Sequence, residues 1–432
     1  MTHLLEKRPT LKSARDGQSL AYIRERFLRV NQGRIARAME SLTPNQQTFL
    51  RLLALFFHVN HPSLPGYVSD CTPAGVSGYE PDGSVIATAK HVAREFTYAS
   101  SPERRQPIHS VFLMGSLGTL AQTDQSDMDV WVCHSPQLTQ AERQALRDKC
   151  QRLEVWAASQ GFEAHCFLID TQRFAQGEHE VQLCTEDGGK TQHHLLLDEF
   201  YRTAIWLAGR TPLWWYVPVC EESRYAEFTH ATDDQHVIGS DDLMDLGHLA
   251  RIPSSEFLGA GLWQLFKGIE SPHKSLLKML LIEVYAREHP HVSCLSLDFK
   301  QAIYANHLNL DELDPYVMVY RRIERYLKAV GEMPRLERVR RSLYLKVNCT
   351  LTGPAAPRGR PWQRQLLARL TAEWGWDESL LTSLDNCSQW KAEEARQERL
   401  AVARELSLSY RFLRQLARNN SRNPGFRVAP RN

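Results

Sequence analysis

Two short apolar runs, joined by a polar linker that begins with Gly-Ser and ends with Asp-x-Asp, constrain the fold of this chain most. Residues 108–114 and 128–133 have the length and apolar content of buried strands. Side chains alternate along a strand, so Asp127 and Asp129 point the same way. Gly115-Ser116 ends the first run, and glycine lets the backbone approach a bound group closely. The segment therefore predicts two strands with paired carboxylates beside a tight turn.

This pattern indicates metal and phosphate chemistry. Two carboxylates on one face repel each other and call for divalent cations, and all-oxygen ligands favour Mg2+ or Mn2+. The amide and hydroxyl of Ser116 are suited to donate to phosphate oxygens. A bare Asp-x-Asp is also common on surface turns, so the prediction depends on the whole order of strand, Gly-Ser, spacer, Asp-x-Asp and strand. That order predicts a phosphoryl- or nucleotidyl-transfer site with two metal ions.

A third carboxylate is expected on a neighbouring strand. After a helical pattern over 141–159, residues 162–169 form a third strand-like run. Glu163 lies near its start and Asp170 at its end. The two acids are an odd number of positions apart, so they face opposite sides of a regular strand. We prefer Glu163 as the third metal ligand and catalytic base, with Asp170 as the alternative.

The length and residue pattern predict an α+β protein of more than one domain. The chain has 432 residues, with 43% hydrophobic and 24% charged residues, which is typical of folded globular proteins. Helical periodicity surrounds the strand-rich segment on both sides, with helices expected over 86–97 and 194–207 and a helix start with an N-cap and first-turn proline at Thr43-Pro44. We expect an N-terminal helical segment that packs on the catalytic core (1–100), a catalytic domain (101–190), a helical nucleotide-binding domain (191–418) and a disordered tail (419–432).

Composition excludes several other classes of protein. The net charge is only +2, which argues against a nucleic-acid partner. Nine cysteines without a C-x-x-C pair predict neither a disulfide framework nor a cysteine zinc site. The N-terminus lacks the apolar core of a signal peptide, and no run approaches the ~18 apolar residues of a membrane span. The expected compartment is the cytoplasm.

Cationic side chains on a later helix are candidates for binding a triphosphate. Lys274 and Lys278 are four residues apart on the predicted helix 271–287 and so share one face. Lys267 precedes them by one to two turns. The alternative is that these lysines are solvated and that their stems cover apolar surface.

Arg202 and two aromatic residues leave further alternatives open. Arg202 either grips a phosphate or pairs with Asp198 four residues earlier. Trp263 and Tyr201 either stack on adenine or belong to the core. No further ligand pattern accompanies two pairs of histidines, which we interpret as structural: His58 and His61, and His193 and His194.

Longer stretches resemble one family. The segment MGSLGTLAQTDQSDMDVWVCH resembles the core of the DNA polymerase beta-type nucleotidyltransferase superfamily and, more narrowly, of the N-terminal catalytic region of class I (enterobacterial-type) adenylate cyclases. HPSLPGY, TQHHLLLDEFYRTA, EFLGAGLWQLFKGIESPHKSLLKMLLIEVY and WGWDESLLTSLDN are similar to the same family. Within 256–267 several aromatic and serine positions of the family signature differ, while Gly259, Trp263 and Lys267 are kept.

The resemblance implies a polymerase beta-like mixed sheet followed by a mostly helical domain. It implies an adenylate cyclase whose substrate is ATP and whose products are 3′,5′-cyclic AMP and pyrophosphate. We expect Asp127, Asp129 and the third acid to hold two Mg2+ or Mn2+ ions, and Ser116 and the lysines to orient the phosphates. Family members are longer and have a C-terminal regulatory region, so we expect this chain to be part of a longer protein.

Two other interpretations share the motif. A nucleotidyltransferase that adenylylates a separate small-molecule or protein acceptor uses the same metal chemistry. A non-catalytic nucleotide-sensing module needs no complete set of metal-ligand carboxylates, and the sequence contains a complete set. The long resemblance over 256–285 favours the cyclase.

Overall fold

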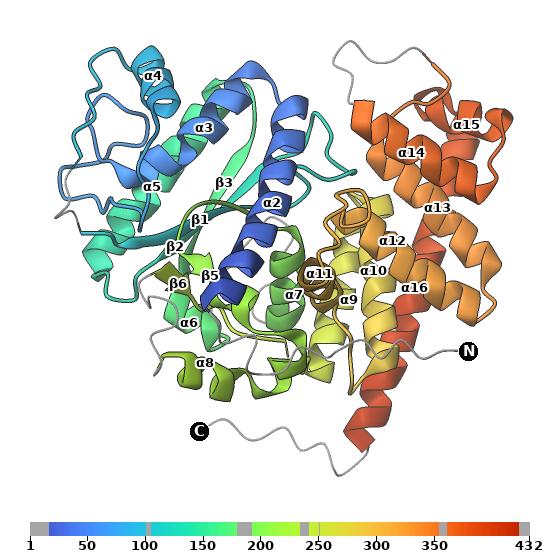
Figure 1. The fold of residues 1–432 in the computed structure, drawn as a ribbon. Helices are drawn as coiled ribbons and strands as arrows, with labels where there is room; N and C mark the ends of the chain where they lie inside the picture. Colours follow the sequence, from blue (N-terminus) through green and yellow to red (C-terminus); the bar gives the residue numbers. More distant parts are fainter. Residues whose placement is uncertain are drawn as a thin grey trace.

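A four-stranded mixed sheet, with helices on both faces, lies beside a larger helical region (Figure 1). The computed structural model describes residues 17–100, 105–178, 192–233, 242–249, 251–353 and 361–422. The predicted α+β class is confirmed, with the strands concentrated in the first half of the chain and helices dominating the second.

The sheet is built from strands that are far apart in the sequence. Its members are β1 (Ile108–Met114), β2 (Met128–His134), β3 (Ala164–Asp170) and β4 (Ile205–Gly209), in the spatial order β3-β2-β1-β4. Strand β1 runs antiparallel to β2 and β4, whereas β2 and β3 are parallel. Every residue of β2 is buried, which explains why this strand is apolar on both faces. The three strands predicted from apolar runs are confirmed within two residues.

Each face of the sheet belongs to a different core. On one face, Val130 and Val132 join the aromatic residues of α3 (Pro44–His58) and the apolar side of α5 (Gln140–Ser159). On the other face, Trp131 stacks on Phe200 of α7 (His193–Thr203) with ring centroids 4.8 Å apart. Helix α7 lies between the sheet and the helical region (Figure 1), so its sequence is apolar on two sides.

Local capping chemistry sets several helix starts. Thr43 is the N-cap of α3, with a reciprocal capping box to Gln46 and a proline in the first turn, as the sequence predicted. Helix α5 begins with the same device at Thr139 and Glu142. Two further N-terminal helices are α2 (Gly17–Ser41) and α4 (Gly83–Val92).

Short elements connect the sheet to the helical region. They are α6 (Thr171–Ala175), the 3-10 helices η2 (Leu213–Tyr216) and η3 (Val219–Arg224), α8 (Tyr225–Asp233), and the two-stranded parallel pair β5 (Thr211–Pro212) and β6 (Leu243–Met244).

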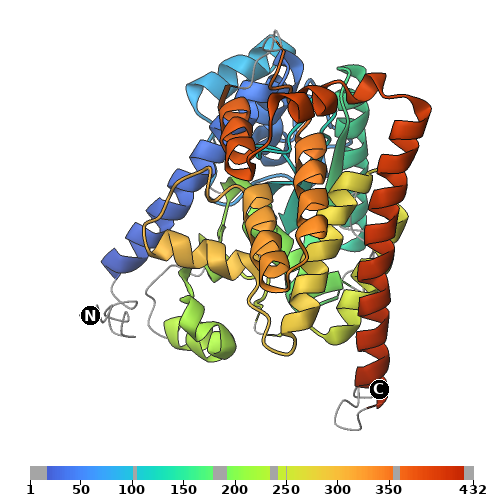
Figure 2. The ribbon, with the colours of Figure 1, turned by 90° about the vertical axis from the view of Figure 1, so that its right-hand side faces the viewer.

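The helical region surrounds α10, which is buried along most of its length. The long α16 packs against α9 and α10 and runs along one side of the molecule (Figure 2). One apolar core extends from the α7 face of the sheet into this region. The elements are α9 (Ser254–Lys267), α10 (Pro272–Glu288), α11 (Leu295–Tyr304), α12 (Pro315–Ala329), α13 (Met333–Val347), α14 (Pro361–Trp374), α15 (Glu378–Asp385), η5 (Cys387–Gln389) and α16 (Ala392–Arg422).

Some predicted boundaries are wrong. The helix expected over 194–207 ends at Thr203, and the residues that follow form β4, because pairing with the distant strand β1 outweighs their local helical pattern. The sheet therefore extends beyond the domain boundary expected at residue 190. The helix expected over 86–97 ends at Val92. Of the predicted tail, 419–422 continue α16 and 423–432 lie outside the described residues. Within the described residues, no helix is long and apolar enough to cross a membrane.

Candidate active site

The Gly-Ser turn and the Asp-x-Asp strand meet at one end of the sheet. Gly115 has a φ of 91°, and a Cβ at this position would lie 4.0 Å from Oδ2 of Asp129. The positive φ favours glycine at this turn, and the turn lies within van der Waals reach of the Asp129 carboxylate. The hydroxyl of Ser116 lies 2.9 Å from the hydroxyl of Ser126, which directly precedes Asp127. The sequence predicted this proximity, although it did not single out Ser126.

Strand register fixes how the two aspartates point. Asp129 lies opposite Met114 on β1 and opposite His165 on β3. It shares the face of Trp131, two residues on, and that face is covered by α7. Asp129 is 4% exposed, whereas Asp127, at the mouth of the strand, is only half-buried. The carboxylate pair thus has one protected member and one that is accessible.

The two candidates for the third acid lie at opposite ends of β3. The carbonyl of Glu163 accepts a hydrogen bond from the Met128 amide at 3.1 Å, which places Glu163 beside Asp127. Glu163 is exposed, and strand alternation gives it the face of His165. Asp170 pairs with His134, five residues beyond Asp129 and so ~16 Å along the strand. Its side chain caps α6 by accepting the Arg173 amide at 3.1 Å. Geometry therefore favours Glu163.

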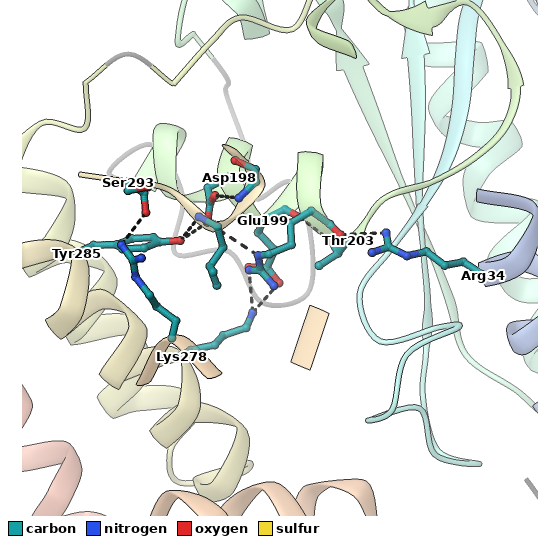
Figure 3. A network of polar contacts seen from close by, with 11 residues as sticks. Arg34, Asp198, Glu199, Thr203, Lys278, Tyr285 and Ser293 are labelled. Atoms are coloured by element: carbon teal, nitrogen blue, oxygen red, sulfur yellow. Dashed lines mark hydrogen bonds and ion pairs between the residues drawn. The ribbon is translucent and has the colours of Figure 1, made fainter. Parts of the chain in front are cut away.

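A pocket opens between α7, α9 and α10, and two of the predicted cations line it. Arg202 and Lys278 line this pocket with Glu199, Asp198 and Tyr285. Figure 3 shows Lys278 beside Glu199 and Tyr285 beside Asp198. The Lys278 ammonium lies 2.9 and 3.1 Å from the two carboxylate oxygens of Glu199. Asp198 accepts hydrogen bonds from the Tyr285 hydroxyl at 3.0 Å and from the Ser296 amide at 2.9 Å.

Arg202 is a buried cation whose charge is incompletely compensated. It is 6% exposed, and its Nε lies 3.9 Å from Oδ2 of Asp198, longer than a hydrogen bond. Within the described residues this Nε has no hydrogen-bond partner. Of the two alternatives raised by the sequence, the pair with Asp198 exists but is loose, and a contact with phosphate stays a prediction. A buried guanidinium at a pocket wall is well suited to receive an anionic group.

Arg34 connects the pocket helix with the Gly-Ser loop, and sequence reasoning missed it. Its guanidinium donates to the carbonyls of Arg202 and Leu313, each at 2.9 Å. Its own carbonyl lies close to the loop, because a Cβ at Gly118 would approach it to 2.5 Å. Burial lowers the pKa of the Arg34 guanidinium to about 10, and its ring neighbour Phe299 lies 4.8 Å away. Arg34 remains charged at neutral pH and ties the end of α7 to the loop.

The other predicted residues lie outside this pocket. Lys274 lies one turn before Lys278 on α10 and does not line the pocket in the described part of the chain. Lys267 pairs with Glu270 at 3.1 Å and lies over the Trp263 ring. Tyr201 stacks on Trp214 with centroids 4.0 Å apart and donates to the Gly247 carbonyl, so it is a core residue.

The four histidines make contacts that account for them without a metal. His58 accepts from the Val76 amide at 3.2 Å, and His61 contacts the hydroxyl of Ser63. His193 packs on Phe174, and His194 pairs with Glu256 at 2.6 Å.

The donor set at the sheet end fits magnesium. Asp127, Asp129 and Glu163 offer only oxygen atoms, and Mg2+ is usually held by one or two carboxylates together with substrate phosphates. Among the described residues, no group of three or more His, Cys, Asp or Glu side chains forms a ready cage for an ion. The carboxylate pair beside the Gly-Ser turn is thus the kind of partial site that a metal–nucleotide complex would complete.

Sequence comparisons place the chain in a family. The family model "Adenylate cyclase NT domain" matches residues 19–215, and "Adenylate cyclase, class-I, second domain" matches residues 252–429. Together these two matches cover most of the chain and both segments that form the site. The chain belongs to the class I adenylate cyclase family.

Curated relatives support the same assignment. The adenylate cyclases of Escherichia coli (strain K12) and Salmonella typhimurium are each 40% identical over 405 residues, which cover 92% of this chain and 47% of those proteins. The adenylate cyclase of Proteus mirabilis is 37% identical over 408 residues, covering 92% of this chain and 46% of that protein. The chain therefore spans about half the length of the curated relatives it matches. No solved structure matches it.

Proposed function

We propose that this chain converts ATP to 3′,5′-cyclic AMP and pyrophosphate. The observation that carries the proposal is the meeting of Gly115-Ser116 with Asp127 and Asp129, on the face of the sheet that α7 covers. Curated relatives that bear the name adenylate cyclase support this reaction over others that use the same motif. We also propose a nucleotidyltransferase ancestry of the polymerase beta type, which the order of strands and acids supports.

Asp127, Asp129 and Glu163 would hold two magnesium or manganese ions. When bound, divalent cations lower the pKa of the ribose 3′-hydroxyl and neutralise charge on the leaving pyrophosphate. Substituting the half-buried Asp127 removes a ligand without disturbing the core, whereas Asp129 is buried beside Gly115. We assign to Glu163 the role of the base that accepts the proton of the 3′-hydroxyl, because it is accessible at the same end of the sheet.

The remaining residues bind and orient the triphosphate. The Ser116 hydroxyl and the amides of the glycine turn donate to phosphate oxygens. Arg202 and Lys278 offer positive charge from the α7–α10 pocket, and Lys278 exchanges Glu199 for phosphate when the nucleotide binds. The ribose 3′-oxygen attacks the α-phosphorus, the bond to pyrophosphate breaks, and both reacting groups belong to one molecule. The enzyme must therefore hold ATP folded rather than bind an acceptor.

Four further assignments remain predictions. Lys274 and Lys267 are retained as candidates for contacts to the triphosphate at its outer end. Asp170 is retained as the alternative third acid, although it lies at the far end of β3. A C-terminal regulatory region is proposed because the curated relatives are about twice as long as the matched segment. A cytoplasmic location stays a prediction from the sequence.

Product analysis with no added acceptor tests the proposal. The protein is incubated with ATP and Mg2+ alone, and the products are identified by mass. Cyclic AMP with equimolar pyrophosphate supports the cyclase. Adenylylation of an added small molecule or protein, without cyclic AMP, supports a transferase with a separate acceptor. Thermal stabilisation by ATP without any product indicates a nucleotide sensor. A parallel incubation with GTP tests whether the base is selected.

A further inference from the structure

The loop between the Gly-Ser turn and Asp-x-Asp is held by a single glutamine of the helical region. Gln363, on α14, is 0% exposed. Its side-chain Nε2 lies 3.2, 3.0 and 3.1 Å from the carbonyl oxygens of Thr119, Leu120 and Gln122, respectively. An amide nitrogen has only two hydrogens, so three carbonyls converge on one donor group. The loop is therefore curled around this side chain.

Two other helices hold the same loop from the same side. Asp314, the N-cap of α12, accepts the Leu120 amide at 2.7 Å. Lys346 of α13 lies 3.3 Å from the Ala121 carbonyl. On the opposite side the Arg34 carbonyl leaves no room for a side chain at Gly118. The middle of the loop is fixed by α12, α13 and α14, and it has no space to shift toward α2.

We propose that Gln363 is a positioning residue for the phosphate- and metal-binding turn. The two ends of the loop carry Ser116 and Asp127, whose spacing depends on the curl that Gln363 holds. The loop lies in the segment matched by the first family model and Gln363 in the segment matched by the second. The second segment thus completes the site of the first without contacting substrate. The effect on catalysis rests on the proposed function, whereas the clamp itself does not.

Kinetics of Gln363 variants test this role. Gln363→Met keeps the length of the side chain but removes the donor, and Gln363→Glu turns an acceptor toward the three carbonyls. Gln365→Met, at an exposed position on the same helix, is the matched control. We expect Gln363→Met to raise the half-saturating Mg2+ concentration and the KM for ATP by about tenfold and to lower kcat, because small displacements of binding groups are costly. We expect Gln363→Glu to change these three constants further in the same direction, and Gln365→Met to leave them at their wild-type values.

The pattern of kinetic constants separates positioning from folding. A purely structural role would reduce the number of active molecules, so kcat would fall while KM and the half-saturating Mg2+ concentration stayed the same. That result would overturn the proposal. If Gln363→Met does not fold, Gln363→Asn, which retains the amide one methylene short, is measured in its place with the same expected direction.

Amide hydrogen exchange tests the clamp without any catalysis. In the full chain without nucleotide, exchange in residues 117–123 should speed up in Gln363→Met and remain unchanged in Gln365→Met and in β1 and β2. Equal exchange in the loop of the wild type and Gln363→Met would refute the clamp. If the protein makes no cyclic AMP, the proposed function fails, yet this measurement still decides whether Gln363 holds the loop.

Discussion

The sheet end and the helical region position their charged groups by different means. In the sheet, backbone register sets Asp129 opposite Met114, and a short loop brings Ser116 to Ser126. In the helical region, buried acids are each surrounded by several cations: Glu283 contacts Arg335 and Arg287, Glu324 contacts Arg321, Arg340 and Lys328, and Glu398 contacts Arg338 and Arg341. Backbone geometry thus builds the carboxylate site, while side-chain charge networks hold the helices that support it.

Removing a carboxylate at the sheet end should abolish activity and spare the fold. We expect Asp129→Asn or Asp127→Asn to reduce cyclic AMP formation by about a thousandfold, as losing one preorganised charge typically costs. Backbone register does not depend on these carboxylates, so far-ultraviolet circular dichroism and the melting temperature should change little. Cyclic AMP production near the wild-type rate in either variant would remove that residue from the mechanism.

Removing a buried acid in the helical region should lower the stability of the fold and spare the activity of the folded molecules. The carboxylate of Glu283 is 1% exposed and accepts from Arg335 at 2.9 Å, from the Ser409 hydroxyl at 2.6 Å and from the Tyr326 hydroxyl at 2.6 Å. Glu283→Gln leaves Arg335 buried with less compensation, so unfolding by urea at pH 7 should become easier by about 3 kcal/mol. Activity per folded molecule should persist. A stability loss below about 0.5 kcal/mol would show that the network contributes little.

The same variant has a defined pH signature. Burial alone raises the pKa of Glu283, but the hydrogen bonds and charge of Arg335, with the two hydroxyls, hold it below its ordinary value of 4.5. A lowered pKa in the folded state stabilises the fold above 4.5, and this contribution disappears as the pH falls through the lowered value. The stability difference between the wild type and Glu283→Gln should therefore shrink below pH 4.5. A constant difference down to pH 3 contradicts this assignment.

The identity of the third acid can be settled with two matched substitutions at the ends of β3. We expect Glu163→Gln to lower kcat by about a hundredfold, in the range of a lost general base. Asp170→Asn should change kcat by less than about threefold, because asparagine also caps a helix. Both variants are compared in the cyclic AMP assay at saturating ATP and Mg2+. The opposite pattern would make Asp170 the third acid.

Cations of the pocket should affect binding more than chemistry. Lys278→Met removes an ammonium that contacts Glu199, and Arg202→Lys keeps the charge but loses the planar guanidinium. Each should raise the KM for ATP by about tenfold, an amount typical of one charge-assisted contact. Lys267→Met is the comparison: this lysine pairs with Glu270 outside the pocket, so a contact at the outer end of the triphosphate would add little, and KM should change by less than about threefold. Equal effects of all three would place the triphosphate nearer α9.

The carboxylate pair, its strands and its turn were predictable because each depends on local patterns. Apolar runs of strand length, alternation and a Gly-Ser pair are visible within about twenty residues, and β1, β2 and β3 agree with the apolar runs. Strand β4 was predicted as part of a helix, since its partner β1 lies about a hundred residues away and no local pattern encodes that pairing. The roles of Arg34 and Glu199 were likewise missed, because their partners come from distant helices.

By itself, the sequence determined which residues are candidates for the chemistry: a glycine that frees the backbone, a serine with a hydroxyl group beside it, and acids that alternate along a strand. Only the tertiary structure decided which cations reach the pocket, which acid lies beside Asp127 rather than at the far end of β3, and which side chain holds the loop. The physical reason is distance along the chain. Spacing rules work within one element, whereas Gln363 and the loop it holds are joined only when α14 packs against the sheet end.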